Sequence, residues 1–209
     1  MKERNNRETE LTSTGVFKKA AAMNLQELLD AQLKLQVDVS FNTHHDFLVR
    51  HGLPDCQSVL DVGTGNGYFC IKLAELYQHI KFVGVDFMED MLQRARDEAR
   101  CLNMDNVQLV AADLRTKPAI GQDEGFDAIL LRYTAYHIKE LKEVLKHLKG
   151  LLKSGGRIWI IDEALLIHKT DPTTITSEDL EMIRDFVENV VPSPDYYGTY
   201  GHVMIAAVK

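Results

Sequence analysis

Residues 59–69 read Val59-Leu60-Asp61-Val62-Gly63-Thr64-Gly65-Asn66-Gly67-Tyr68-Phe69, an apolar run followed by three glycines at alternate positions. The apolar run predicts a buried strand over 58–62, and the pattern that follows the glycines predicts a helix over 68–78. Glycines at such a turn let backbone amides approach a ligand closely, at the positive end of the helix. The segment therefore predicts a ligand-binding loop between a strand and a helix.

Two common nucleotide-binding loops do not fit this segment. A dinucleotide-binding loop needs the pattern G-x-G-x-x-G, whereas the third glycine here is Gly67 and Tyr68 follows it. A phosphate loop of the Walker type needs Gly-Lys-Ser/Thr, which does not follow the glycines. The nicotinamide and Walker interpretations are therefore set aside.

Beyond the loop, short apolar runs alternate with helical patterns. Strands are predicted at 80–85, 107–112, 126–131, 157–162 and 202–208, and helices at 88–102, 138–152 and 176–190. Alternation of this kind is typical of a largely parallel sheet with helices on both faces. We therefore expect an α/β fold with a Rossmann-like, doubly wound sheet.

The N-terminal segment has a different pattern. Residues 24–38 and 41–51 read as two helices, closed by Gly52 and Pro54. We expect residues 1–54 to form a polar tail and a helical cap, and residues 55–209 to form the main domain.

The amino-acid composition and the net charge of the chain favour some classes of protein over others. A chain of 209 residues with 45% hydrophobic and 26% charged residues is typical of a single globular domain. The net charge of −7 argues against nucleic acid or an anionic membrane as a partner held mainly by charge. The three cysteines form no C-x-x-C pair, so we expect neither a disulfide framework nor a zinc site built on cysteines. With no membrane-length apolar run and no signal-peptide stretch, a cytoplasmic location is expected.

Four segments in order resemble the motifs of class I S-adenosylmethionine-dependent methyltransferases, and the resemblance covers residues 58–163. They are the glycine loop, Phe82-Val83-Gly84-Val85-Asp86, Val110-Ala111-Ala112-Asp113-Leu114, and the pair formed by 126–131 and 151–158. The resemblance implies the sheet order 3-2-1-4-5-7 and an antiparallel C-terminal hairpin. Residues 192–201 show no clear strand six, so we expect an abbreviated hairpin.

The resemblance also implies cofactor-binding residues. Asp86 matches the acid that holds both ribose hydroxyls of S-adenosylmethionine, and Asp113 matches the acid that accepts from the adenine amino group. A carboxylate can accept from two vicinal hydroxyls through charge-assisted hydrogen bonds, and ligands bind at the carboxyl ends of such strands. Phe87 and Leu114 would flank the adenine, and the backbone carbonyl of Arg132 would meet the methionine moiety.

The glycine loop completes this set. Gly63, Gly65 and Gly67 would bring the backbone close to the cofactor. Asp61 is similar to the acid that orients the cofactor's amino group through water. The alternative, that Asp61 only braces the loop amides, stays open.

Catalytic residues are less evident. Methyl transfer is an in-line displacement that positioning alone can accelerate, so a general base is needed only when the acceptor must lose a proton. His137 is the candidate base, and packing at a helix start is the alternative. His44-His45-Asp46 suggests a metal site, but no third ligand is evident and a surface helix face is favoured.

The function favoured by the sequence is transfer of a methyl group from S-adenosylmethionine to a small-molecule acceptor, through an O, N or C atom. One alternative is a methyltransferase acting on protein or RNA, which the acidic charge disfavours. The other is a non-catalytic cofactor-binding module, or pseudoenzyme, that acts through a protein partner. The acceptor and the oligomeric state, a homodimer included, stay open.

Overall fold

The structure is a computed structural model that describes residues 24–116, 120, 125–163, 195–199 and 202–208. The helix predicted over 176–190 lies outside these residues. Two compact units meet in the sequence between Val39 and Ser40, and the second unit, Ser40–Lys209, contains the sheet. Among the described residues, no helix is both long and apolar enough to cross a membrane.

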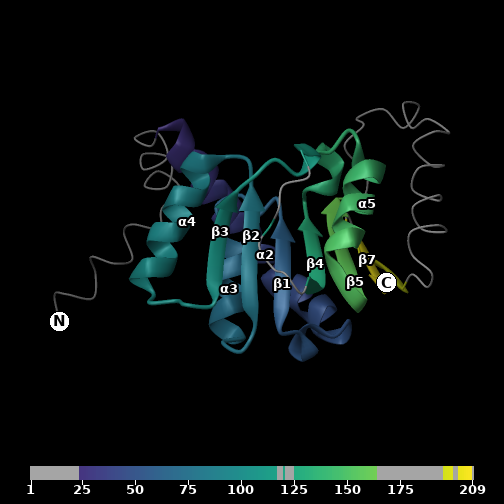
Figure 1. The fold of residues 1–209 in the computed structure, drawn as a ribbon. Coiled ribbons are helices and arrows are strands. Elements are labelled where there is room, and N and C mark those ends of the chain that lie inside the picture. The colour runs from purple at the N-terminus through teal and green to yellow at the C-terminus, as the bar shows by residue number, and fades with distance from the viewer. Residues whose placement is uncertain (1–23, 117–119, 121–124, 164–194, 200–201, 209) are drawn as a thin grey trace. The chain divides into compact units, whose positions relative to one another are not determined.

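Seven strands form one sheet in the order β3-β2-β1-β4-β5-β7-β6 (Figure 1). The strands are β1 Ser58–Val62, β2 Lys81–Asp86, β3 Val107–Ala111, β4 Phe126–Arg132, β5 Leu152–Glu163, β6 Asp195–Thr199 and β7 His202–Val208. Strands β1 to β5 pair in parallel, and β7 runs antiparallel to β5. The Rossmann-like α/β fold and the order 3-2-1-4-5-7 are therefore confirmed.

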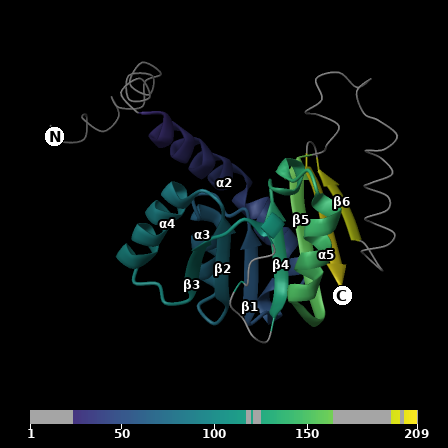
Figure 2. The ribbon, with the colours of Figure 1, turned by 45° about the horizontal axis from the view of Figure 1, so that its top comes forward.

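The expectation of an abbreviated C-terminal hairpin is wrong. Strand β6 pairs antiparallel with β7 along its whole length, from Asp195 to Thr199, at the sheet edge beyond β5 (Figure 2). Its sequence, Asp195-Tyr196-Tyr197-Gly198-Thr199, contains a glycine and no alternation of apolar and polar residues. An edge strand is held by backbone hydrogen bonds to a single neighbour, so it needs no such alternation and is hard to recognise from sequence.

Three α-helices flank the described strands, namely α3 Tyr68–Leu76, α4 Glu89–Cys101 and α5 Leu141–Leu151, and α2 spans Leu25–Arg50. Short 3₁₀ turns lie at η2 Leu53–Asp55, η3 Leu114–Thr116 and η4 Ala135–His137. The prediction of two N-terminal helices is wrong, because α2 is continuous. No glycine or proline interrupts it, and the first breaking residue is Gly52, with φ at +88°.

The junction after α5 also differs from the prediction. Strand β5 begins at Leu152, directly after α5, whereas the sequence predicts a helix to 152 and a strand only from 157. Pairing of Leu152 with Phe126, followed by a register shift, accommodates Gly155 at φ +75° inside the strand. Pairing with β4 therefore sets the start of β5, which the sequence alone places at 157.

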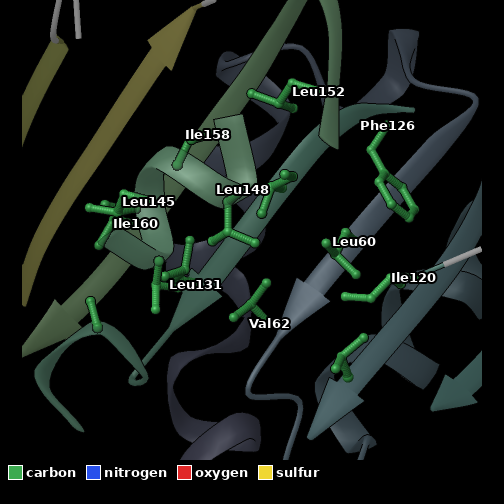
Figure 3. Packing of buried hydrophobic residues seen from close by; sticks show 14 of the residues in the cluster. Leu60, Val62, Ile120, Phe126, Leu131, Leu145, Leu148, Leu152, Ile158 and Ile160 are labelled. Atoms are coloured by element: carbon green, nitrogen blue, oxygen red, sulfur yellow. The ribbon is translucent and has the colours of Figure 1, made fainter. Parts of the chain in front are cut away.

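The larger hydrophobic core lies between α5 and one face of the sheet (Figures 1 and 3). Strand residues in this core occupy alternate positions and so share one face. They include Leu60 and Val62 of β1, Val83 and Val85 of β2, and Ile129 and Leu131 of β4. The residues between and after them, Asp61, Asp86 and Arg132, therefore lie on the opposite face.

The opposite face is covered by the helices of the first crossovers. A smaller core joins α3, α4 and β3 through Ile71, Leu92, Ala95, Ala99 and Leu109. Right-handed crossovers from β1 through β3 place α3 and α4 on the same side of the sheet. The side chains of Asp61, Asp86 and Arg132 therefore lie on the face of the sheet that α3 and α4 cover.

Candidate functional site

The glycine loop connects β1 to α3 in a backbone conformation that favours glycine. Gly63, Gly65 and Gly67 all have positive φ, at +70°, +59° and +68°. A Cβ atom on Gly63 would overlap the side chain of Thr134, and one on Gly67 would lie 2.7 Å from the Cβ of Ala95. The turn therefore favours glycine at all three positions, and close packing adds a second requirement at Gly63 and Gly67.

Asp86 lies at the carboxyl end of β2 and accepts hydrogen bonds from two backbone amides. Its Oδ2 accepts from the N–H of Gly65 at 2.8 Å, and its Oδ1 accepts from the N–H of Met88 at 3.0 Å. Each carboxylate oxygen can accept a second hydrogen bond. The side chain is thus oriented at the loop and retains acceptor capacity. Beside it, Phe87 is 74% exposed.

Asp113 and Leu114 follow β3 on the neighbouring strand end. The N–H of Ala112 donates to the backbone oxygen of Asp86 at 2.9 Å, which joins the two strand ends. The N–H and the hydroxyl of Thr116 both donate to the backbone oxygen of Asp113, closing the turn η3. Both Asp113 and Leu114 are half-buried. The structure thus brings Asp113 to the same edge of the sheet as Asp86.

Asp61 is the buried charge of this site, with 4% of its surface exposed. The Thr64 hydroxyl donates to its Oδ2 at 2.7 Å. Burial raises the pKa of Asp61 to about 6, and the negative charge of Asp86 acts in the same direction. The Thr64 hydrogen bond and the positive charge of Arg132 oppose this shift. The hydrogen-bond partner of the Asp61 carboxylate is thus the Thr64 hydroxyl of the glycine loop.

Arg132 ends β4, and its guanidinium lies against two aromatic rings. The guanidinium carbon lies 4.7 Å from the ring centre of Phe69 and 4.5 Å from that of Tyr133. Its Nε donates to Nδ1 of His44 at 3.2 Å, and its Nη2 donates to the Ser40 hydroxyl at 3.1 Å. Burial lowers the pKa of Arg132. Its backbone oxygen, the atom singled out from the sequence, accepts from the Thr134 hydroxyl at 3.0 Å.

The glycine loop lies beside acidic residues at the ends of adjacent strands. A comparison with protein-family profiles agrees with this arrangement. The profile of the family described as "Methyltransferase domain" matches residues 53–200. The chain belongs to this methyltransferase family.

Curated relatives of the methyltransferase domain are similar over part of their length. Carboxy-S-adenosyl-L-methionine synthase of Nautilia profundicola is 28% identical over 136 residues, 64% of this chain and 52% of the relative. Demethylmenaquinone methyltransferase of Oceanobacillus iheyensis is 26% identical over 142 residues, 66% of this chain and 56% of the relative. The chain spans about half the length of the curated relatives it matches.

Solved structures show the same fold. An S-adenosylmethionine-dependent methyltransferase of Aquifex aeolicus aligns with a TM-score of 0.62 at 22% identity, covering 78% of this chain and 88% of that one. A putative methyltransferase of Methanococcus maripaludis aligns with a TM-score of 0.66 at 18% identity, covering 86% and 91%. Both similarities concern the fold alone.

His137 follows β4 in the methyltransferase domain, at the position that the sequence indicates. It ends the short turn η4, where its N–H donates to the backbone oxygen of Thr134 at 3.0 Å, and α5 begins only at Leu141. Its side chain is exposed. The structure therefore places His137 after β4, close in sequence to Arg132, with solvent access.

The preferred interpretation of His44-His45-Asp46 as a surface helix face is wrong for His44. His44 is fully buried, contacts the rings of Phe69 and Tyr133, and accepts from Arg132. Because a guanidinium only donates, Nδ1 of His44 carries no proton. His45 instead bonds the Tyr77 hydroxyl through Nε2 at 2.8 Å. No group of three metal-binding side chains occurs in the part of the chain that was described.

Sequence reasoning missed the residues that surround Arg132. Ser40 and His44 are four positions apart, so a continuous helix places them on one face. This spacing could have been noticed only if α2 had been predicted as one helix. That Arg132 is the partner of Ser40 and His44 depends on β4 lying beside them. Thr64 and Tyr133 were likewise visible as polar and aromatic neighbours of the motifs, with no pattern to single them out.

Proposed function

We propose that the chain binds S-adenosylmethionine at the carboxyl ends of β1 to β4 and transfers its methyl group to a small-molecule acceptor through O, N or C. The observation that carries the proposal is the carboxylate of Asp86, held by the amides of Gly65 and Met88 beside the glycine loop. This arrangement presents oriented acceptor atoms at the strand ends where ligands of such sheets bind.

The proposed contacts follow from position. Asp86 accepts from the ribose hydroxyls, and the exposed ring of Phe87 lies against the adenine with Leu114 on its other side. Asp113 accepts from the adenine amino group, at the strand end joined to Asp86. The close backbone of Gly63, Gly65 and Gly67 leaves room for the cofactor at the start of α3. Asp61 attracts the cofactor's ammonium group.

The chain's part in the chemistry is to orient the reactants and exclude water. When bound, the cofactor supplies a methyl group on a positively charged sulfur, which an acceptor lone pair attacks in line. Proximity and orientation can supply about 7–11 kcal/mol of such a barrier. Where the acceptor must lose a proton, we propose His137 as the group that takes it, since it follows β4 and reaches solvent.

Support for a small acceptor comes from relatives and from charge. Curated relatives include demethylmenaquinone methyltransferase and (S)-tetrahydroprotoberberine N-methyltransferase of Eschscholzia californica. The net charge of −7 disfavours nucleic acid as a partner. We also propose a cytoplasmic location, because all three cysteines are free thiols, as a reducing compartment would keep them.

Calorimetric titration with S-adenosylhomocysteine, after removal of any co-purified ligand, tests the binding step. We expect one-to-one binding with a dissociation constant in the micromolar range, and no binding at millimolar ligand would overturn the proposal. A screen of small acceptors for release of S-adenosylhomocysteine then tests transfer. Cofactor binding without turnover, together with a stable complex with another protein, would instead favour a non-catalytic module.

A further inference from the structure

The first half of α2 exposes a stripe of apolar side chains (Figure 2). Leu25, Leu35 and Val39 are 82%, 63% and 80% exposed, and Leu28 is 38% exposed. Apolar side chains gathered on one exposed face mark an interaction surface more often than scattered ones do. All four lie in the part of α2 that belongs to the first compact unit, which ends at Val39. The stripe is therefore a feature of that unit by itself.

The spacing of the stripe is that of a coiled-coil seam. Successive positions are separated alternately by three and four residues, and they are Leu25, Leu28, Gln32, Leu35 and Val39. These five positions form the α2 seam. Such spacing puts side chains in one narrow line along a helix, at the a and d positions of a heptad repeat. Side chains in such a line fit into the holes between the side chains of a facing seam, so the α2 seam is suited to a helical partner.

The charges of the same segment lie away from the α2 seam. Asp30 and Lys34 form an ion pair at 3.5 Å, one helical turn apart and outside the line of the seam. The only polar residue of the seam is Gln32, which is exposed. A glutamine amide both donates and accepts, so two of them can bond each other across a helix pair. A single polar residue in a seam thereby favours the register that brings it opposite its own counterpart.

The described chain offers no second seam that could cover this one. Among the described residues of α3, α4 and α5, Leu76 is the only large apolar side chain that is exposed. The α2 seam of another copy is complementary, because in a parallel, in-register pair Gln32 faces the partner's Gln32. Two seams about 22 Å long would together bury roughly 1,000 Å², which is the lower limit for a specific interface.

We propose that the chain forms a parallel, in-register dimer through the α2 seam. A second copy is the occupant because the described helix face that matches the seam is the seam itself. The interface uses no residue of the proposed cofactor site, so it does not depend on the proposed function. Its small area means that the dimer dissociates on dilution, with a dissociation constant in the micromolar range.

Sedimentation velocity of the full chain over a wide range of concentration tests the dimer. We expect wild type to change from monomer to dimer as its concentration rises. Leu35→Glu should raise the dissociation constant about 100-fold, because like charges then meet within the seam. Leu76→Glu changes a leucine of α3 that is 58% exposed, so it is the matched control and should dimerise as wild type does. Circular dichroism should show the same helix content in both variants, since both changed residues are exposed.

Charge complementation at residue 35 separates this pairing from any other. Leu35→Glu and Leu35→Lys should each stay monomeric alone and should form a dimer when mixed, since residue 35 faces residue 35 in the parallel, in-register pair. A mixture that stays monomeric would overturn the proposal. A wild type that stays monomeric would also overturn it, and would leave a different protein as the occupant of the seam. If Leu35→Glu dimerises as wild type does, the interface lies elsewhere and the proposal is wrong.

Discussion

Asp86 is the residue on which cofactor affinity should depend most. Its two oxygens are oriented by the amides of Gly65 and Met88, so ribose hydroxyls would meet acceptors that are already in place. We expect Asp86→Ala to lose about 10- to 1000-fold in affinity for S-adenosylhomocysteine, measured by calorimetry, because one or two charge-assisted hydrogen bonds disappear. Asp105→Ala, an exposed acid beyond α4, should leave affinity unchanged. Equal affinity in Asp86→Ala and wild type would remove the ribose assignment.

Asp61 should make the protein less stable as the pH rises through the acid range. Its pKa is about 6 in the folded protein against an ordinary 3.8, so the folded state holds this proton more tightly than the unfolded state does. The unfolding free energy that depends on this group is therefore highest below about pH 4. Between about pH 4 and pH 6 this contribution to the unfolding free energy falls by about 2–3 kcal/mol, and above pH 6 it stays constant.

The variant Asp61→Asn isolates this effect, because all other titrating groups stay the same. We expect its unfolding free energy minus that of wild type to increase by about 2–3 kcal/mol between pH 4 and pH 7. Urea unfolding followed by circular dichroism at half-unit pH intervals measures the difference. A difference that does not vary with pH would mean that Asp61 titrates normally.

At the scale of elements, alanine substitutions of two glycines should change the stability of the protein in opposite directions. Gly63 has φ at +70° in the loop before α3, and an added methyl group would overlap Thr134. Gly150 lies on the exposed side of α5, and nothing lies within 4 Å of a Cβ built there. We expect Gly63→Ala to cost about 1–3 kcal/mol of stability. Gly150→Ala should instead stabilise by about 0.5–1 kcal/mol, since alanine favours a helix.

Thermal unfolding of the two variants and of wild type measures whether each change stabilises or destabilises the protein. Titration with S-adenosylhomocysteine adds a second readout. Gly63→Ala should also bind the ligand more weakly, because the shifted loop moves the amide of Gly65 away from Asp86. Gly150→Ala should bind as wild type does. A neutral or stabilising Gly63→Ala would show that the loop relaxes freely at this position.

The continuity of α2 has a consequence at the same scale. One unbroken helix from Leu25 to Arg50 puts Ser40 and His44 on the side of the helix that meets Arg132. Two separate helices, as predicted from the sequence, would have left that register undefined. The described contacts around Arg132 therefore depend on the helix being continuous through Ser40 and His44, as well as on the strand that carries the arginine.

At the scale of the whole molecule, ligand binding should stabilise the folded chain. A ligand that binds only the folded state, at 100 times its dissociation constant, adds about 2.7 kcal/mol. For a domain of this size we expect S-adenosylhomocysteine to raise the melting temperature by about 5–10 °C, measured by scanning calorimetry. Adenine at the same concentration is the control. No shift at saturating S-adenosylhomocysteine would contradict the proposed function.

The amino-acid sequence was enough for the class of fold and the position of the glycine loop, and the resemblance to class I methyltransferases supplied the order of the sheet. Buried strands and amphipathic helices repeat with local periods, and the glycines at 63, 65 and 67 are imposed by the backbone of a short turn. Such information is carried by residues close together in the chain, so it is readable without coordinates. Asp86 and Asp113 were singled out by the resemblance, which places the family's acids at or just after the ends of the second and third strands.

The tertiary structure was needed wherever a residue's environment comes from distant parts of the chain. Strand β6 exists because β7 offers it a backbone edge, and β5 begins early because Phe126 pairs with Leu152. The raised pKa of Asp61 comes from burial, and the placing of Arg132 comes from α2, 88 and 92 residues away in the chain. Burial, register and long-range contacts leave no local period in a sequence, because they depend on which elements come to lie side by side.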